Sequence, residues 1–282
     1  MQIRITENQF NNLKYSCRKQ GQLDCCHKLN ENNQDEVDSD DVSLDSFYPK
    51  DALADSIWSG QELNPRVRLT LLDIADDFIE FLKMDWVDCK DIVLTGSICN
   101  YNWSDYSDID VHIIYDFSEI DDNADLVRSY VDAKKNEWMS NHEDLEIYGF
   151  SVEMYVENCL DKGAVSSGRY SLEKNKWLSK PSKDDIELHS NNEIKDLSAE
   201  IMTMIDDIEV CYEKAETDGD LESLDSQLEE ICEIVKAMRK SELEKHGEMA
   251  VGNIVYKVLR REGYLDKLYG LRNSIYDEIN SI

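Results

Sequence analysis

The sequence predicts a small mixed α/β domain, with a sheet flanked by helices, that is followed by an all-α helical bundle. Three observations support this fold class: an amphipathic helical stretch, short apolar runs with period-two alternation after it, and a long helical region after Pro181. With 282 residues and 41% hydrophobic composition, the chain is long enough to bury a core, and one or two domains are expected.

The N-terminal part of the chain, residues 1–30, is expected to contain a short strand at 3–5 and a helix over 7–19. From Glu31 to Asp45 the chain then carries many acidic residues and no basic one. Such a segment cannot bury enough apolar surface to offset its ordering entropy, so residues 31–62 are expected to form a flexible acidic linker. An acidic peptide that mimics nucleic acid is the alternative.

Residues 63–183 are expected to form one domain with the order helix, strand, strand, helix, strand. Apolar residues recur at helical spacing after Pro65, which is well placed to begin the first helix. After it come a short apolar and β-branched run, two stretches in which apolar and polar residues alternate, and a second stretch with helical spacing. The strands are predicted at Ile92–Thr95, Ile109–Tyr115 and Ser151–Glu157, and the second helix at Asp125–Met139.

The remaining residues, 184–282, are expected to form a bundle of three or four helices. Apolar residues recur at helical spacing from Ile201 to Tyr212 and again from Leu221 to Val235. The expected boundaries between helices are Gly219, Gly247 and Gly263.

The charge of the chain restricts its partners. There are 61 acidic and 30 basic residues, a formal net charge of −31, so the surface repels phosphate backbones unless basic residues gather locally. Long duplex nucleic acid is therefore not an expected partner.

No stretch approaches the roughly 18 to 20 apolar residues that span a bilayer, and the N-terminus lacks the apolar core of a signal peptide. No membrane partner is therefore expected. The eight cysteines include no CxxC pair, and we expect them to be reduced thiols in a cytoplasmic protein.

The most informative stretch places Gly96 and Ser97 after the first predicted strand, and Asp108 and Asp110 on the second. Alternate residues of a strand share a face, so the two aspartates project together, about 7 Å apart, and can share a pair of magnesium ions. Gly96 lets a backbone approach a phosphate closely, and Ser97 supplies a hydroxyl. A helix that begins just after Ser97 would add an anion site. Either motif alone is an ordinary turn or a solvated face, but the combination predicts a nucleotide site.

This pattern resembles the DNA polymerase beta-like nucleotidyltransferase superfamily, which includes minimal nucleotidyltransferases, CCA-adding enzymes, poly(A) polymerases and aminoglycoside nucleotidyltransferases. In that superfamily a third acid lies on a later strand, and the matching residue here is Glu153. A closer resemblance, from Leu63 to Pro181, is to predicted nucleotidyltransferases encoded by tailed bacteriophages, which implies the cytoplasm of a bacterial host. The runs that carry it are LNPRVRLTLLDIADDFIEFL, LTGSICNYNWSDYSDIDVHIIYDF, YGFSVEMYVEN and SSGRYSLEKNKWLSKP.

The resemblance implies an α/β nucleotidyltransferase fold and an enzyme that moves a nucleoside monophosphate from a nucleoside triphosphate, expected to be ATP, to a hydroxyl, with release of pyrophosphate. Asp108, Asp110 and Glu153 would be catalytic and would bind two Mg²⁺ ions, replaceable by Mn²⁺. Gly96 and Ser97 would hold the triphosphate.

A triphosphate also needs cations, and the chain is locally basic from Asp161 to Lys183 and from Lys236 to Arg272. In the first segment Arg169 and Lys176 are the expected phosphate contacts, and Tyr170 or Trp177 is available to stack on a base. The equal alternative is that the basic residues are ordinary surface residues and that the aromatic residues pack in the core. The second segment is where a structured RNA end would dock. His112, on the carboxylate face, is expected to be a structural histidine.

The acceptor is expected to be a protein, an RNA end or a small molecule, and the sequence does not choose among them. One alternative is a catalytically silent nucleotide-binding or protein-interaction module on the same fold. Another is an antitoxin-like adenylyltransferase that acts on a helical toxin partner. Intact Asp108, Asp110 and Glu153 favour an active enzyme, because a silent site has no physical need to keep a repulsive cluster of acids.

Overall fold

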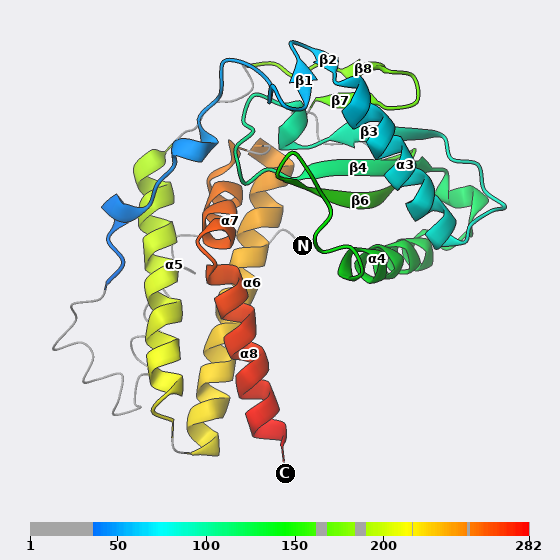
Figure 1. Ribbon diagram of the computed structural model, residues 1–282. Coiled ribbons are helices and arrows are strands. Elements are labelled where there is room, and N and C mark those ends of the chain that lie inside the picture. The colour runs from blue at the N-terminus through cyan, green and yellow to red at the C-terminus, as the bar shows by residue number, and fades with distance from the viewer. Residues whose placement is uncertain (1–35, 162–167, 184–189, 216, 247–248, 282) are drawn as a thin grey trace. The chain divides into compact units, whose positions relative to one another are not determined.

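The computed structural model describes residues 36–161, 168–183, 190–215, 217–246 and 249–281. The chain divides into two compact units, Asp45–Glu187 and the combination of Met1–Leu44 with Leu188–Ile282. Within them lie a small mixed sheet and a C-terminal helical part, drawn in Figure 1. The structure therefore confirms the predicted mixed α/β class with an all-α C-terminal part.

The sheet of the unit Asp45–Glu187 has six described strands in the order β5-β6-β4-β3-β7-β8. They are β3 (Asp91–Thr95), β4 (Ile109–Tyr115), β5 (Glu146–Ile147), β6 (Phe150–Asn158), β7 (Arg169–Ser171) and β8 (Lys176–Ser179). Only the pair β4 and β6 is parallel, and the other pairs among these strands are antiparallel. The same unit contains the hairpin of β1 (Trp58–Ser59) and β2 (Glu62–Leu63), and the helices α3 (Pro65–Leu82) and α4 (Ala124–Ser140).

Helix α3 begins at Pro65, as the sequence predicts. The side chain of Asn64 caps the helix by accepting a hydrogen bond from the backbone N–H of Arg66 at 2.9 Å. Proline at the first position loses no intrahelical hydrogen bond, because that N–H has no partner in a helix. One stripe of the helix is buried in the core: Val67, Leu71, Ala75, Phe78 and Leu82.

One face of the sheet is apolar and packs against α3 and α4, and Figure 1 shows α3 running across the strands. Ile109, Val111 and Ile113 of β4 and Val152 and Met154 of β6 are fully or almost fully buried on this face. Alternation puts the intervening residues of both strands on the other face. The five predicted elements all occur in the predicted order, with boundaries shifted by at most a residue, and the short strand β5, which was not predicted, lies between α4 and β6.

The expected flexible linker differs from the structure over residues 36–62. Leu53, Ile57 and Trp58 are buried in the core of the unit Asp45–Glu187, and the Trp58 indole donates a hydrogen bond to the Ile98 carbonyl at 2.9 Å. In the other unit, Val42 is buried near the 3₁₀ turn η1 (Ser39–Asp41). Apolar residues between the acids thus reach a core, which acidic density alone does not reveal. The strand at 3–5, the helix at 7–19 and residues 31–35 lie outside the described residues.

The C-terminal part contains four described helices: α5 (Asn191–Tyr212), α6 (Asp218–His246), α7 (Val251–Arg261) and α8 (Tyr264–Asn280). Gly263 precedes α8 with a φ of 79°, which glycine adopts without a steric cost. This boundary is confirmed, whereas Gly219 lies in the first turn of α6 and Gly247 is outside the described residues. Among the described residues, no helix is both long enough and apolar enough to cross a membrane.

The cysteines only partly follow the expectation of reduced thiols. Cys89, Cys99, Cys159 and Cys232 are free. Cys211, buried on α5, is disulfide-bonded, which differs from the sequence-based expectation.

Candidate active site

The second face of the sheet carries half-buried polar side chains. On β4 they are Asp110 and His112, and on β6 they are Glu153, Tyr155 and Glu157. Each alternates with a neighbour on the other face, because successive residues of a strand point in opposite directions. The two strands therefore present a continuous polar surface.

The acidic residues expected at the site come together at one end of this surface. Asp110 and Glu153 are register partners on the parallel strands β4 and β6, and Thr95 faces Asp110 across the antiparallel pair β3 and β4. Asp108 lies directly before β4, two residues from Asp110. These registers place Asp110 between Thr95, at the end of β3, and Glu153, with Asp108 two residues away along the chain.

Gly96 in that turn lies directly against the Asp110 carboxylate. Its φ of 78° lies in the region that L side chains avoid, and a Cβ atom at this position would be 1.9 Å from Oδ2 of Asp110. No residue with a side chain fits there without moving the carboxylate.

Ser97 ties the same turn to the start of β4. Its hydroxyl donates a hydrogen bond to Oγ of Ser107 at 2.8 Å, and Ser107 Oγ also accepts from the backbone N–H of Ser104 at 2.9 Å. Only one 3₁₀ turn, η3 (Ser97–Cys99), follows Gly96. The helix N-terminus considered as an anion site after Ser97 is therefore absent from this described segment.

Glu153 is held by two neighbours at one oxygen. The Tyr155 hydroxyl donates a hydrogen bond to Oε2, and the Lys135 ammonium of α4 lies 3.9 Å from the same atom. Burial, and then the hydrogen bond to Glu153, raise the pKa of Tyr155, with smaller contributions from Asp110 and Asp108. Burial lowers the pKa of Lys135, although attraction to Glu153 and Asp110 opposes it. Both shifts show how closely these charges are packed away from water.

His112 and Arg169 converge on Glu157, the next acid along β6. Nδ1 of His112 lies 2.7 Å from Oε2, and Arg169 donates from one guanidinium nitrogen to both carboxylate oxygens at 2.9 and 3.1 Å. The His112 ring also stacks on Tyr155, with 4.9 Å between centroids. Burial raises the pKa of Glu157, but the hydrogen bond from His112 and the charge of Arg169 outweigh it, so the pKa lies below its usual value. His112 is therefore a satisfied histidine, in line with the structural role expected for it.

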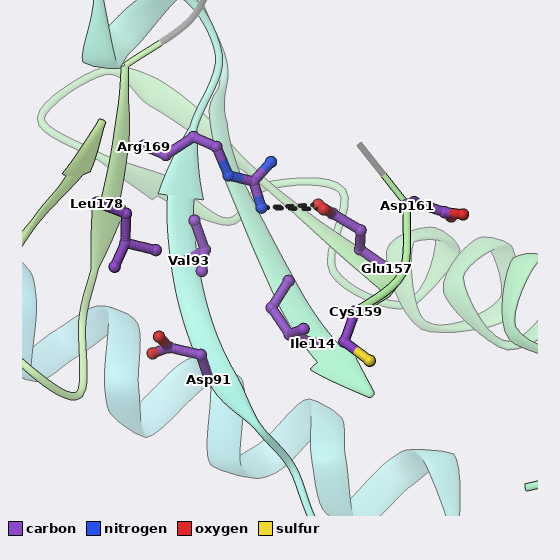
Figure 2. Close-up of a pocket in the computed structure, with 8 residues that line it drawn as sticks. All are labelled: Asp91, Val93, Ile114, Glu157, Cys159, Asp161, Arg169 and Leu178. Carbon is purple, nitrogen blue, oxygen red and sulfur yellow. Dashed lines mark hydrogen bonds and ion pairs between the residues drawn. The ribbon is translucent and has the colours of Figure 1, made fainter. Parts of the chain in front are cut away.

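A pocket of about 210 Å³ opens at the far end of the same polar face. Figure 2 shows Val93 and Ile114 between the Glu157–Arg169 ion pair and Asp91. Asp108, Asp110 and Glu153 do not line it. Ile114 is four residues along β4 from Asp110, so the pocket and the acids occupy opposite ends of one surface.

The segment that carries Arg169 packs against the Gly96 turn. Thr95 Oγ1 donates a hydrogen bond to the Gly168 carbonyl at 3.1 Å, and a Cβ at Gly168 would lie 2.2 Å from the Cys99 carbonyl oxygen. The two motifs that are most prominent in the sequence, around residues 96 and 169, are therefore adjacent in the fold.

The aromatic residues of this segment pack internally. Tyr170 is 4% exposed, and Trp177 stacks on Trp58 with 4.7 Å between centroids while its indole donates to the Gln61 carbonyl. These contacts favour the alternative of core aromatics over base stacking. Lys176 is exposed on the edge strand β8, three positions from β4 in the sheet order.

The donor atoms of the acid cluster, Asp108, Asp110 and Glu153, suit a divalent cation such as Mg²⁺. All are carboxylate oxygens, the ligands that Mg²⁺ prefers, and the Gly96 backbone lies directly against the carboxylate of Asp110. As the side chains stand, no three His, Cys, Asp or Glu residues in the described part of the chain converge on a metal position. Glu153 instead contacts Tyr155 and Lys135.

Three participants in this surface do not follow from the sequence motifs. Tyr155 and Glu157 continue the alternation that places Glu153, so the period-two pattern of β6 was the signal that could have found them. Lys135 has no such signal, because its contacts depend on how α4 packs beside the sheet.

No protein-family model matches the chain, and no curated protein matches it. A search of solved structures finds a STING-associated CdnE c-di-GMP synthase from Capnocytophaga granulosa, 12% identical, with 98% of this chain and 100% of that chain covered. The TM-score is 0.22, which does not establish a shared fold.

Proposed function

We propose that this protein is a metal-dependent nucleotidyltransferase of the DNA polymerase beta-like superfamily. It moves a nucleoside monophosphate from a triphosphate, which we propose is ATP, to a hydroxyl of an acceptor, and pyrophosphate leaves. The observation that carries the proposal is the junction of β3, β4 and β6. There the Gly96 backbone abuts the Asp110 carboxylate, and Asp110 is in register with Glu153.

Asp108, Asp110 and Glu153 are the residues that would hold Mg²⁺ or Mn²⁺. When bound, such ions stabilise the charge on the phosphate oxygens and the attacking and leaving oxygens. Gly96 and Ser97 would hold the triphosphate, Gly96 through its backbone and Ser97 through its hydroxyl. Glu153 would also help to deprotonate the acceptor hydroxyl.

Arg169 and Lys176 are the proposed phosphate contacts. Arg169 uses one guanidinium nitrogen, Nη2, for both bonds to Glu157. A guanidinium has five N–H donors, so others can bind a phosphate while the ion pair persists. Glu157 thus fixes the direction of the arginine along the polar face.

The acceptor that we propose is a protein, an RNA end or a small molecule. Nucleotide binding without turnover, in a protein-interaction module, is the competing function that an assay must separate from transfer. The carboxylates and Gly96 favour turnover, because a nucleotide held only by cations would gain nothing from three acids beside its phosphates.

The test uses triphosphates labelled at either the α or the γ phosphorus, with Mg²⁺ and a cell lysate as the source of acceptors. Nucleotidyl transfer puts the α label into an acceptor and releases the γ label as pyrophosphate. Asp110→Ala is the control that should remove both signals. Transfer of the γ label to an acceptor, or saturable binding without labelled product, would contradict the proposal.

A further inference from the structure

We propose that Lys135 is a built-in counter-cation of the acid cluster, which positions Glu153 and weakens the binding of the first metal ion. The inference rests on the proposed function, because it assumes that the carboxylates hold metal. Lys135 belongs to α4 and lies outside the sequence motifs. Its role follows from four features of its surroundings.

The first feature is that the Lys135 ammonium is fixed in place. Nζ lies 3.4 Å from the centroid of the Tyr155 ring, a cation–π contact, and 3.9 Å from Oε2 of Glu153. The Lys135 side chain is 21% exposed and that of Glu153 is 25% exposed. Two groups of the polar face, a ring and a carboxylate, therefore hold the ammonium beside the acid cluster.

The second feature is that the two contacts of Glu153 with Tyr155 and Lys135, among the described residues, involve the same oxygen. The Tyr155 hydroxyl donates to Oε2, and the Lys135 ammonium also faces Oε2. The carboxylate is therefore held from one side, and Oε1 is the oxygen left to meet a cation. The hydrogen bond from Tyr155 orients the carboxylate, and the Lys135 ammonium places a positive charge beside it.

The third feature is the charge of the whole cluster. Lys135 interacts favourably with Glu153, Asp110 and Asp108, so its charge acts on all three proposed metal ligands. Because the group is mostly shielded from water, this interaction is screened less than a surface ion pair. One positive charge offsets part of the mutual repulsion, and an entering divalent cation must compete with it.

The fourth feature is the contrast with the adjacent lysine. Lys134 lies on the same helix, pairs with Glu137 one turn away at 2.8 Å, and lies 4.7 Å from the centroid of the Phe81 ring. It has the same chemistry and the same kinds of contact, but its carboxylate partner is not in the acid cluster. Lys134→Met is therefore a matched control for Lys135→Met.

The experiment measures Mn²⁺ affinity without nucleotide, by the loss of the free-ion signal in electron paramagnetic resonance. Lys135→Met keeps the length of the side chain and removes the charge, so it should bind Mn²⁺ about tenfold more tightly than the wild type. Lys135→Arg restores the charge and should return the affinity to within about twofold of the wild type, as should Lys134→Met. Thermal melting of each variant checks the fold, and Lys135→Gln replaces Lys135→Met if the latter does not fold.

The outcomes distinguish the role of Lys135 from the proposed function on which it rests. Mn²⁺ binding that requires Asp110, together with tighter binding in Lys135→Met but not in Lys134→Met, supports the counter-cation. Asp110-dependent binding that Lys135→Met leaves unchanged or weakens overturns it and leaves the proposed function standing. Binding that Asp110→Ala does not affect overturns the proposed function, and the role of Lys135 with it.

Discussion

Gly96 and Asp110 are so close that a Cβ atom on the glycine would lie 1.9 Å from Oδ2 of the aspartate. The glycine also has a φ of 78°. The same residue thus satisfies two separate constraints, one from the backbone of the turn and one from the carboxylate beside it. The close approach joins the end of β3 to the side chain that we propose binds metal.

Gly96→Ala should remove transfer activity by displacing Asp110. A displacement of about 1 Å at a reacting centre can cost roughly 100-fold in rate. The matched control is Gly149→Ala, where φ is 84° but nothing lies within 4 Å of the added methyl group. Both variants should lose about 1 to 2 kcal/mol of stability from the unfavourable φ, measured by urea unfolding. Equal activity in the two variants would show that the contact with Asp110 does not matter for transfer.

The elements that the sequence predicts well are those long enough to show a period. The helix α3 and the strands β4 and β6 each repeat their apolar pattern several times, which fixes both the element and its buried face. The strands β1, β2, β5, β7 and β8 have two to four residues each, which is too short for a period to emerge. They form because neighbouring strands and turns position them.

The same reasoning explains what was predictable at the site. Alternation places Asp110 and Glu153 on one face, but their alignment as partners depends on the register of β4 against β6. The partner of Ser97 proves to be Ser107, ten residues away, and that of Arg169 proves to be Glu157. Such contacts depend on tertiary packing, which periodicity does not encode.

Asp110→Ala should abolish transfer and leave the protein folded, because the side chain lies on the polar face and not in the apolar core. Removal of one carboxylate from a repulsive cluster should leave the melting temperature without Mg²⁺ unchanged or raise it. Glu146→Ala, at an exposed position on β5, is the control for loss of an acid. Near-normal turnover by Asp110→Ala would refute its assignment as a metal ligand.

Ser97→Ala should weaken triphosphate use modestly, since one charge-assisted hydroxyl contact contributes on the order of 1.5 to 3 kcal/mol. The hydrogen bond to Ser107 offers a second explanation for any loss, because it ties the turn to β4. Ser107→Ala removes that bond and keeps the Ser97 hydroxyl. A larger rise in KM for Ser97→Ala than for Ser107→Ala indicates a phosphate contact, whereas equal effects would mean that Ser97 only shapes the turn.

The ion pair of Glu157 predicts a pH dependence of stability. The pKa of Glu157 in the folded protein lies below the reference value of 4.5, so its charge stabilises the fold above that value. This contribution is lost as the pH falls through the lower, folded pKa. The difference in unfolding free energy between the wild type and Glu157→Gln should therefore be largest above about pH 4.5 and shrink below it. Urea unfolding at several pH values measures it, and a difference that grows in acid would contradict the prediction.

The protein should bind long duplex DNA weakly, with a micromolar or weaker Kd at about 0.15 M salt. At this salt concentration, electrostatic screening over about 8 Å leaves only close contacts. Duplex binders neutralise several phosphates with a broad basic face, and this chain has a net charge of −31. Its locally basic C-terminal segment is partly neutralised within its own unit. There Lys267 pairs with Asp206 at 2.6 Å and Arg272 with Glu229 at 2.9 Å. Titration of labelled duplex DNA, tRNA and a protein extract measures the preference, and submicromolar binding to random duplex DNA would show that the basic residues form a surface after all.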